Sequence, residues 1–345
     1  MWFNNFGRKE LILIMHKKIK IKYAGICFFI IATALLIIGM YKAANHFLPI
    51  IIKQGDDFFT ILSGSDYKIP FLPDSNEQNS KKPLSDKLFS PYAILVRLKD
   101  RKTVFETKSQ DIIYPASLTK IMTAIVAIEN IPDIHDTIVL PSSIFSDLYS
   151  ANASLAGFLP EEEAAAIDIL YGALLPSGAE CCIGLARHIA GSEQEFVKMM
   201  NKKAKDLGMD KTHFENTTGL YEDNHYTTVK DISILLEYAL ENETFRRIFT
   251  SERYTTCSTN LHPNGITFYS TMFVKIVKSE FSGGKILGGK TGYAGDKTGL
   301  CLASLAEKDG SEYILVTAGA DGNSSTDQYH IIDAFTVYDK YLENK

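Results

Sequence analysis

The sequence predicts a mixed α and β (α+β) fold, in which an antiparallel sheet is flanked by helices and carries a helical subdomain. The prediction rests on the order of the elements: strand patterns near residue 93, a mostly helical middle from about residue 140 to 250, and strand patterns again after residue 286. Strands, then helices, then strands and a last helix are typical of this architecture. The chain has 345 residues, enough for one large domain or two ordinary ones.

The elements follow from local patterns. Residues 93–98 and 103–107 are strand-like and are separated by a polar connection, which predicts a β-hairpin. Residues 117–128 are apolar on almost every side, which is typical of a helix buried in a core. Thr228 is predicted to cap a later helix, with Asp231 in the capping-box position. We expect the closing strands over residues 287–293, 299–306 and 313–319, and a last helix over residues 328–342.

The charge of the chain is unevenly distributed. The net charge is −5, but residues 1–22 hold six basic side chains against one acidic side chain, a charge of +5 that leaves −10 for the rest. An acidic main body argues against a nucleic-acid partner. No metal-binding spacing or disulfide framework is formed by the five cysteines, which are expected to be small buried residues: Cys27, Cys181, Cys182, Cys257 and Cys301. We expect no cofactor and no metal.

An uncharged apolar stretch follows the basic tail. Residues 23–40 are long enough to span a bilayer, since about 18 apolar residues suffice. The sequence after them is a poor cleavage site, so an uncleaved signal anchor is favoured over a cleaved signal peptide or a buried core helix. The basic flank predicts that the chain start lies inside the cell. We therefore expect a cytoplasmic tail (1–22), a transmembrane anchor (23–41), a stalk (42–88) and an extracytoplasmic domain (89–345).

Ser117 and Lys120 form an S-x-x-K pair at the start of the apolar helix. Residues three apart lie on one helical face, so the hydroxyl and the amine can meet. Burial lowers the pKa of a lysine, and a neutral lysine can take a proton from a serine. Alone, the motif is short enough to occur by chance, and an ordinary helix start with an exposed lysine is the simpler alternative.

Two further motifs follow in order. Ser177 lies in a Pro-Ser-Gly turn between two helical stretches, where its hydroxyl could pass a proton; an N-cap role for the following helix is an equally good interpretation. Lys290, Thr291 and Gly292 end a predicted strand and offer a cation, a hydroxyl and room for close backbone approach. This combination suits a substrate carboxylate, although a solvated strand end is the simpler alternative.

The three motifs together resemble the signature set of penicillin-binding proteins and serine β-lactamases. Residues 91–320 are similar to the low-molecular-mass penicillin-binding proteins that act as serine D-alanyl-D-alanine carboxypeptidases. The resemblance is carried by residues 115–123, 170–178, 185–191, 214–220, 225–228, 289–293 and 299–303. It implies the penicillin-binding/serine β-lactamase-like fold, peptidoglycan stem peptides ending in D-Ala-D-Ala as substrates, and β-lactam antibiotics as inhibitors.

The resemblance also implies roles for individual residues. Ser117 is the acyl-ester nucleophile, Lys120 is the general base, and Ser177 is a proton relay between Lys120 and Lys290. A like charge on Lys290 is expected to help lower the pKa of Lys120.

Substrate binding is assigned by the resemblance to the end of the predicted strand. Lys290 and Thr291 would hold the terminal carboxylate, and Gly292 belongs to the same binding motif. The backbone N–H groups of Ser117 and Tyr293 would form the oxyanion hole.

The chain departs from the family pattern at position 179, where alanine replaces the usual asparagine of the second motif. We expect altered substrate positioning or weaker β-lactam binding. The alternatives are a β-lactamase, or a non-catalytic penicillin-binding sensor or scaffold. A class A β-lactamase needs a glutamate to activate water, and no such loop is evident. A sensor would need a signalling domain, for which 22 inner residues are too few. The sequence does not separate ordinary wall trimming from a role in glycopeptide resistance.

Overall fold

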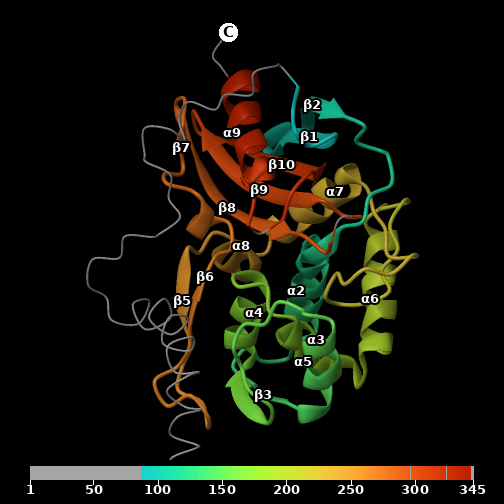
Figure 1. Cartoon of the computed structure of the whole chain (residues 1–345), viewed down its shortest axis with the longest axis vertical. Helices are drawn as coiled ribbons and strands as arrows, with labels where there is room; N and C mark the ends of the chain where they lie inside the picture. The colour runs from blue at the N-terminus through green and yellow to red at the C-terminus, as the bar shows by residue number, and fades with distance from the viewer. Residues whose placement is uncertain (1–86, 296, 324, 343–345) are drawn as a thin grey trace, which may run out of the picture. The chain divides into compact units, whose positions relative to one another are not determined.

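The computed structural model describes residues 87–295, 297–323 and 325–342 (Figure 1). By its backbone contacts the chain divides into two units, residues 1–74 and 75–345, and every described residue belongs to the second. The expected basic tail, the expected membrane anchor and nearly all of the expected stalk therefore lie outside the described residues. Among the helices that are described, none has both the length and the apolar character needed to cross a membrane.

A six-stranded antiparallel sheet forms one half of the described domain, with the strand order β2-β1-β10-β9-β8-β7. The expected hairpin and the three expected C-terminal strands are all present. The strands are β1 (Tyr92–Arg97), β2 (Lys102–Thr107), β7 (Glu280–Phe281), β8 (Gly284–Gly292), β9 (Leu300–Lys308) and β10 (Ser311–Ala320). Because β1 pairs with β10, the beginning and the end of the domain meet inside one sheet.

Both faces of the sheet are covered by helices. Successive side chains of a strand point to opposite sides, so neighbouring residues of one strand belong to different core clusters. Leu95 and Leu315 belong to a cluster with the last helix, α9 (Tyr329–Tyr341). Their neighbours Ile94 and Val316 belong to the larger cluster formed with the other helices. The sheet therefore separates α9 from the rest of the helices, and the core on the α9 side is the smaller one.

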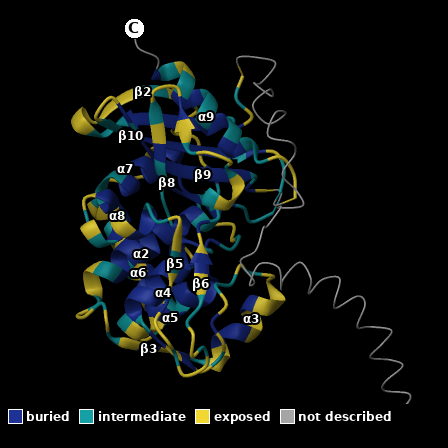
Figure 2. Ribbon diagram, turned by 90° about the vertical axis from the view of Figure 1, so that its left-hand side faces the viewer, coloured by how far each residue is buried: buried dark blue, intermediate teal, exposed yellow. Residues whose placement is uncertain are grey.

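The expected helical middle is confirmed and fills the other half of the domain (Figures 1 and 2). Its helices are α2 (Thr119–Asn130), α3 (Phe145–Ser150), α4 (Ala166–Leu174), α5 (Ala179–Ala190), α6 (Glu193–Asp206), α7 (Val229–Leu240) and α8 (Glu243–Phe249). Every residue of α4 is buried, and α7 packs on β1 and β10. Thr228 caps α7 as expected, since its hydroxyl accepts a hydrogen bond from the Asp231 N–H at 3.0 Å.

Two short hairpins within and after this helical part were not expected. β3 (Thr137–Leu140) pairs with β4 (Glu162–Ala165), and β5 (Arg253–Thr255) pairs with β6 (Thr267–Tyr269). The sequence of β4, EEAA, favours a helix by composition. Tertiary contacts override that preference, because the buried Glu162 carboxylate binds Thr259 and His262 at 2.5 and 2.8 Å.

The expectation that all cysteines are buried is wrong at one described position. Cys181, Cys182 and Cys301 are buried free thiols, whereas Cys257 is exposed. Cys257 follows β5, and its backbone N–H binds the Asp168 carboxylate at 3.1 Å. The contact that holds this residue in place therefore uses its main chain, and its side chain is left in solvent.

Candidate active site

Ser117 and Lys120 meet at the junction of the sheet and the helices. Lys120 Nζ lies 3.1 Å from Ser117 Oγ, and only 2% of the Lys120 surface is exposed. The α-helix begins at Thr119 and not at Ser117, because residues 116–118 form a 3₁₀ turn. Ala116, just before the serine, has a φ of 47°. This left-handed conformation is strained for a residue with a Cβ, and such strain is concentrated at functional sites.

Ser177 and Lys290 form a second hydroxyl–amine pair. Lys290 Nζ donates to Ser177 Oγ at 2.9 Å and to its neighbour's carbonyl, Thr291 O, at 2.8 Å. Ser177 has a φ of 70°, so both turns that carry a serine contain a left-handed residue other than glycine. The N-cap interpretation of Ser177 is wrong: the N-cap of α5 is Gly178, and it makes no side-chain capping bond.

The end of β8 lies directly against the Ser117 turn. A Cβ on Gly292 would stand 3.2 Å from Ser117 N and 3.3 Å from Pro115 O, so a side chain there would crowd the serine. Thr291 Oγ1 lies 2.8 Å from Thr271 Oγ1, which orients the threonine. Tyr293 follows the last strand residue and is partly buried. The structure thus brings Lys290, Thr291 and Gly292 beside Ser117.

A loop that sequence reasoning left without a role also reaches this site. The Thr218 carbonyl accepts a hydrogen bond from Lys120 Nζ at 2.6 Å. Asn216 shapes the loop, since its Oδ1 accepts from the N–H groups of Thr218 and Gly219 at 3.1 and 2.8 Å. Gly219 has a φ of +81° and approaches so closely that a Cβ there would lie 1.8 Å from Ala116 O. The sequence signal was the Asn-Thr-Thr-Gly run, which marks a turn but does not reveal its partner.

Burial controls the protonation of the two lysines. It lowers the pKa of Lys120, while Cys182, Glu180 and Cys181 act in the opposite direction. It lowers the pKa of Lys290 still further, and the positive charge of Lys120 adds to that effect. The expected repulsion between the two lysines therefore lowers the pKa of Lys290. The main cause of the lowered pKa of Lys120 is loss of hydration. Burial thus favours the neutral form of the amine beside Ser117.

Ala179, the departure from the family pattern, is buried, with 1% of its surface exposed. It is the first residue of α5, and its N–H donates to Ser154 O at 2.8 Å. Its neighbour Glu180 is also fully buried and was not singled out in the sequence. In the described part of the chain, no group of three or more His, Cys, Asp or Glu side chains is arranged to hold a metal ion.

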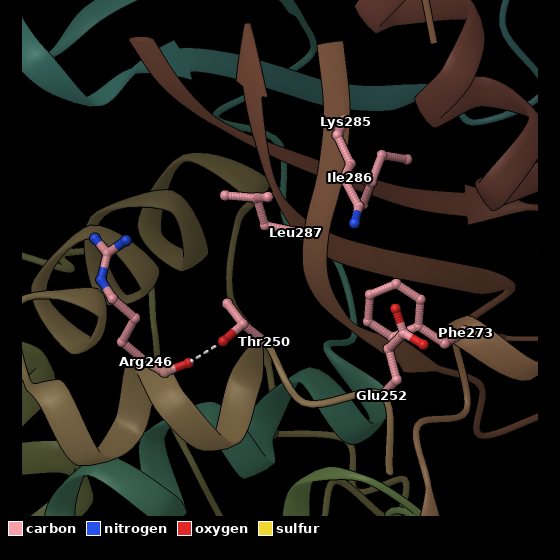
Figure 3. Close-up of a pocket in the computed structure, with 7 residues that line it drawn as sticks. All are labelled: Arg246, Thr250, Glu252, Phe273, Lys285, Ile286 and Leu287. Carbon is pink, nitrogen blue, oxygen red and sulfur yellow. Dashed lines mark hydrogen bonds between the residues drawn. The ribbon is translucent and has the colours of Figure 1, made fainter. Parts of the chain in front are cut away.

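A pocket of about 380 Å³ lies along the other end of β8 (Figure 3). Its lining includes none of the expected site residues and consists of Arg246, Thr250, Glu252, Phe273, Lys285, Ile286 and Leu287. The Arg246 guanidinium points away from this pocket and is held by the Glu312 carboxylate at 2.7 and 3.2 Å. The chemistry of the two serine–lysine pairs is therefore separate from this pocket.

The sequence profile of the D-alanyl-D-alanine carboxypeptidases, peptidase family S11, matches residues 77–322. The chain belongs to this family. Among its curated relatives, carboxypeptidase DacF of Bacillus subtilis is 34% identical over 233 residues, which cover 66% of this chain and 57% of DacF. Carboxypeptidase DacC of Escherichia coli is 30% identical over 192 residues, 50% of this chain and 48% of DacC. The chain thus spans about half the length of these two family members.

Solved structures carry the same fold. The crystal structure of a Streptomyces DD-transpeptidase superposes with a TM-score of 0.66 at 22% identity and covers 75% of this chain and 98% of its own. A D-alanyl-D-alanine carboxypeptidase from Mycobacterium tuberculosis gives a TM-score of 0.64 at 22% identity, with 75% and 93% covered. The expected penicillin-binding/serine β-lactamase-like α+β architecture is therefore confirmed.

Proposed function

We propose that the protein is a membrane-anchored serine D-alanyl-D-alanine carboxypeptidase, which removes the terminal D-alanine from peptidoglycan pentapeptide stems. The observation that carries the proposal is the contact of 3.1 Å between Ser117 Oγ and the amine of Lys120, which is buried and has a lowered pKa. Membership of the S11 family supports the choice of reaction. The names of the relatives, which are D-alanyl-D-alanine carboxypeptidases, support the choice of substrate.

In the acylation step, neutral Lys120 accepts the proton of Ser117 as Oγ bonds to the carbonyl carbon of the penultimate D-alanine. The C–N bond then breaks, and the amine of the leaving D-alanine takes up a proton from the Lys120 and Ser177 side of the site. Ser177 is suited to this transfer, because its hydroxyl is bound to Lys290 at 2.9 Å. A positioned acid–base group of this kind typically contributes 10²–10⁴-fold in rate.

The negative charges of the reaction have candidate partners at the end of β8. We propose that Lys290 and Thr291 hold the terminal carboxylate of the stem peptide. A Cβ on Gly292 would lie 3.2 Å from Ser117 N, so the N–H of the next residue, Tyr293, is proposed as the second donor of an oxyanion hole with the Ser117 N–H. Such donors act on the charge that develops at the carbonyl oxygen, and losing one typically costs about 100- to 1,000-fold in rate.

Water attacks the ester carbonyl to complete the cycle, which frees the shortened stem and returns the proton to Ser117. A β-lactam presents a strained amide to the same serine and stays attached as an ester. Ala179 lacks the amide that the second motif of the family usually supplies, and we expect it to slow acylation by β-lactams without abolishing it.

Anchoring is proposed from the sequence of residues 23–41 and the basic tail before them, which would place the catalytic domain on the extracytoplasmic side. The anchor would keep the enzyme beside the precursors that it trims.

The test is incubation of the detergent-solubilised full chain with a D-Ala-D-Ala pentapeptide, followed by mass spectrometry. We expect release of D-alanine by the wild type and none by Ser117→Ala. If the wild type releases no D-alanine but is labelled by a fluorescent penicillin, the sensor or scaffold alternative, which Ala179 favours, replaces the carboxypeptidase. Rapid turnover of the penicillin would indicate a β-lactamase instead.

A further inference from the structure

Glu180 is a fully buried carboxyl group that the proposed reaction does not use. It lies in the first turn of α5, three residues after Ser177, and 0% of its surface is exposed. Its Oε1 accepts hydrogen bonds from the N–H groups of Ala156 and Gly157 at 2.6 and 3.1 Å. Its Oε2 has no hydrogen-bond partner among the described residues. A buried carboxyl with one unsatisfied oxygen is costly, so its retention calls for a reason.

The hydrogen bonds of Glu180 stabilise the turn that presents Ser177. Residues 154–157 lie against this turn: Ser154 O accepts from Ala179 N at 2.8 Å, and Glu180 holds the N–H groups of Ala156 and Gly157. The packing is close, since a Cβ on Gly178 would lie 2.7 Å from the Ala156 Cβ. Because Ser177 has the unfavourable φ of 70°, it needs such external support to keep its hydroxyl on Lys290.

Burial raises the pKa of Glu180, which disfavours its charged form, while the N–H groups of Ala156 and Gly157 and the charge of Lys120 act in the opposite direction. The thiols of Cys181 and Cys182 on α5 also influence the pKa of Lys120, and Cys182 influences that of Lys290. Burial raises the pKa of Cys182 to about 12, so that thiol stays neutral.

Two other ionisable groups lie on the elements around the lysines. Glu193 on α6 influences Cys182 and is bound to the Thr217 N–H and hydroxyl at 2.9 and 2.7 Å. The pKa of His225 is lowered to about 4 by burial, with smaller contributions from His213 and Lys120, so His225 adds no charge at neutral pH.

We propose that Glu180 is a positioning residue of the acylation site, which holds the Ser177 turn through residues 154–157. It touches no reacting atom and acts through Ser177. The inference rests on the proposed function, because it concerns the acylation of Ser117.

The test compares Glu180→Gln and Glu180→Ala with the wild-type full chain. The rate constant for acylation by a fluorescent penicillin is measured from pH 5 to 10, together with kcat and KM for D-alanine release. Glutamine keeps an oxygen for the two N–H groups, so kcat and the pH profile of Glu180→Gln are expected to stay close to those of the wild type. Alanine removes both hydrogen bonds, and kcat is expected to fall by roughly 10-fold at every pH.

Glu162→Ala is the matched control. Glu162 is also fully buried and hydrogen-bonded, but its partners are Leu159, Thr259 and His262. This variant is expected to leave kcat of the folded protein unchanged. Equal kcat values for the glutamine and alanine variants of Glu180, or the same loss in Glu162→Ala, refute the positioning role. In both cases the wild type still releases D-alanine. If the wild type neither releases D-alanine nor is acylated, the proposed function itself is wrong and the inference fails with it.

Discussion

Gly219 and Gly191 provide a direct test of how the Ser117 turn is held. Both have left-handed backbones, with φ values of +81° and +78°. A Cβ on Gly219 would lie 1.8 Å from Ala116 O, whereas a Cβ on Gly191 would meet nothing within 4 Å. The two glycines therefore share the same backbone strain when replaced by alanine and differ only in the space available.

The magnitude follows from these distances. Alanine in a left-handed conformation costs about 1–2 kcal/mol, which both variants share. For Gly219→Ala the contact must also open from 1.8 Å to at least 3.0 Å, and the atom that must move is the carbonyl oxygen next to Ser117. A displacement of about 1 Å in a reacting group lowers the rate by roughly 100-fold. We expect that loss in Gly219→Ala and an unchanged rate in Gly191→Ala.

The assay is the rate of acylation by a fluorescent penicillin, normalised to the fraction of folded protein from thermal unfolding. Gly191→Ala is expected to lower Tm by about 2–4 °C for each kcal/mol lost. Gly219→Ala is expected to lower Tm by more. Should the folded Gly219→Ala protein react as fast as Gly191→Ala, the Gly219 contact does not position Ser117 and the reasoning is refuted.

Two further predictions concern buried ionisable groups. Burial lowers the pKa of Lys290, so between that lowered pKa and pH 10.5 the unfolded chain binds more protons and the unfolding free energy rises with pH. Lys290→Met should therefore raise the unfolding free energy at pH 7 by about 1 kcal/mol while abolishing D-alanine release, and the gain should shrink toward pH 10.5. Denaturant unfolding across pH measures this, and a variant less stable than the wild type at pH 7 would contradict it. Burial also lowers the pKa of His225 from 6.5 to about 4, so its contribution to stability is lost as the pH falls from 6.5 through 4. The unfolding free energy of His225→Gln should fall by about 3 kcal/mol less than that of the wild type over that range. His330, whose pKa is about 3, acts equally in both proteins. Parallel curves of unfolding free energy against pH would rule out this role of His225.

Local patterns were sufficient to predict the parts of the fold that depend on neighbouring residues. Thr228 and Asp231 form a cap within one turn, and the hairpin of β1 and β2 is closed by a short connection. The start of α2 was misplaced by two residues, because the strained φ of Ala116 is maintained by contacts with distant segments such as Gly219. Periodicity carries no information about such contacts.

The candidate site was predictable in its residues but not in its supports. Ser117, Ser177 and Lys290 could be identified because each belongs to a short motif. The carbonyl of Thr218 could not, since any residue has a carbonyl and only the fold brings this one to Lys120. Glu180 was missed for a related reason: an acidic residue in the first turn of a helix is common and usually solvated, and its burial arises from packing against residues 156–157.

The pairing of β1 with β10 has a consequence for how the domain is made. Tyr92 lies opposite Ala318, and the N–H groups of Phe89 and Ser90 bind the carboxylate of Asp333 on α9 at 3.0 and 2.6 Å. β1 can therefore pair with β10 only after residues 311–320 have been synthesised, and contacts between such distant residues form slowly. Until β10 is made, the edges of β1 and β9 that it covers are open to other chains, and the apolar face that α9 covers stays open until α9 is made. Termination between β9 and α9 would thus leave Ser117, Lys120 and Lys290 in the chain and still yield a chain that aggregates.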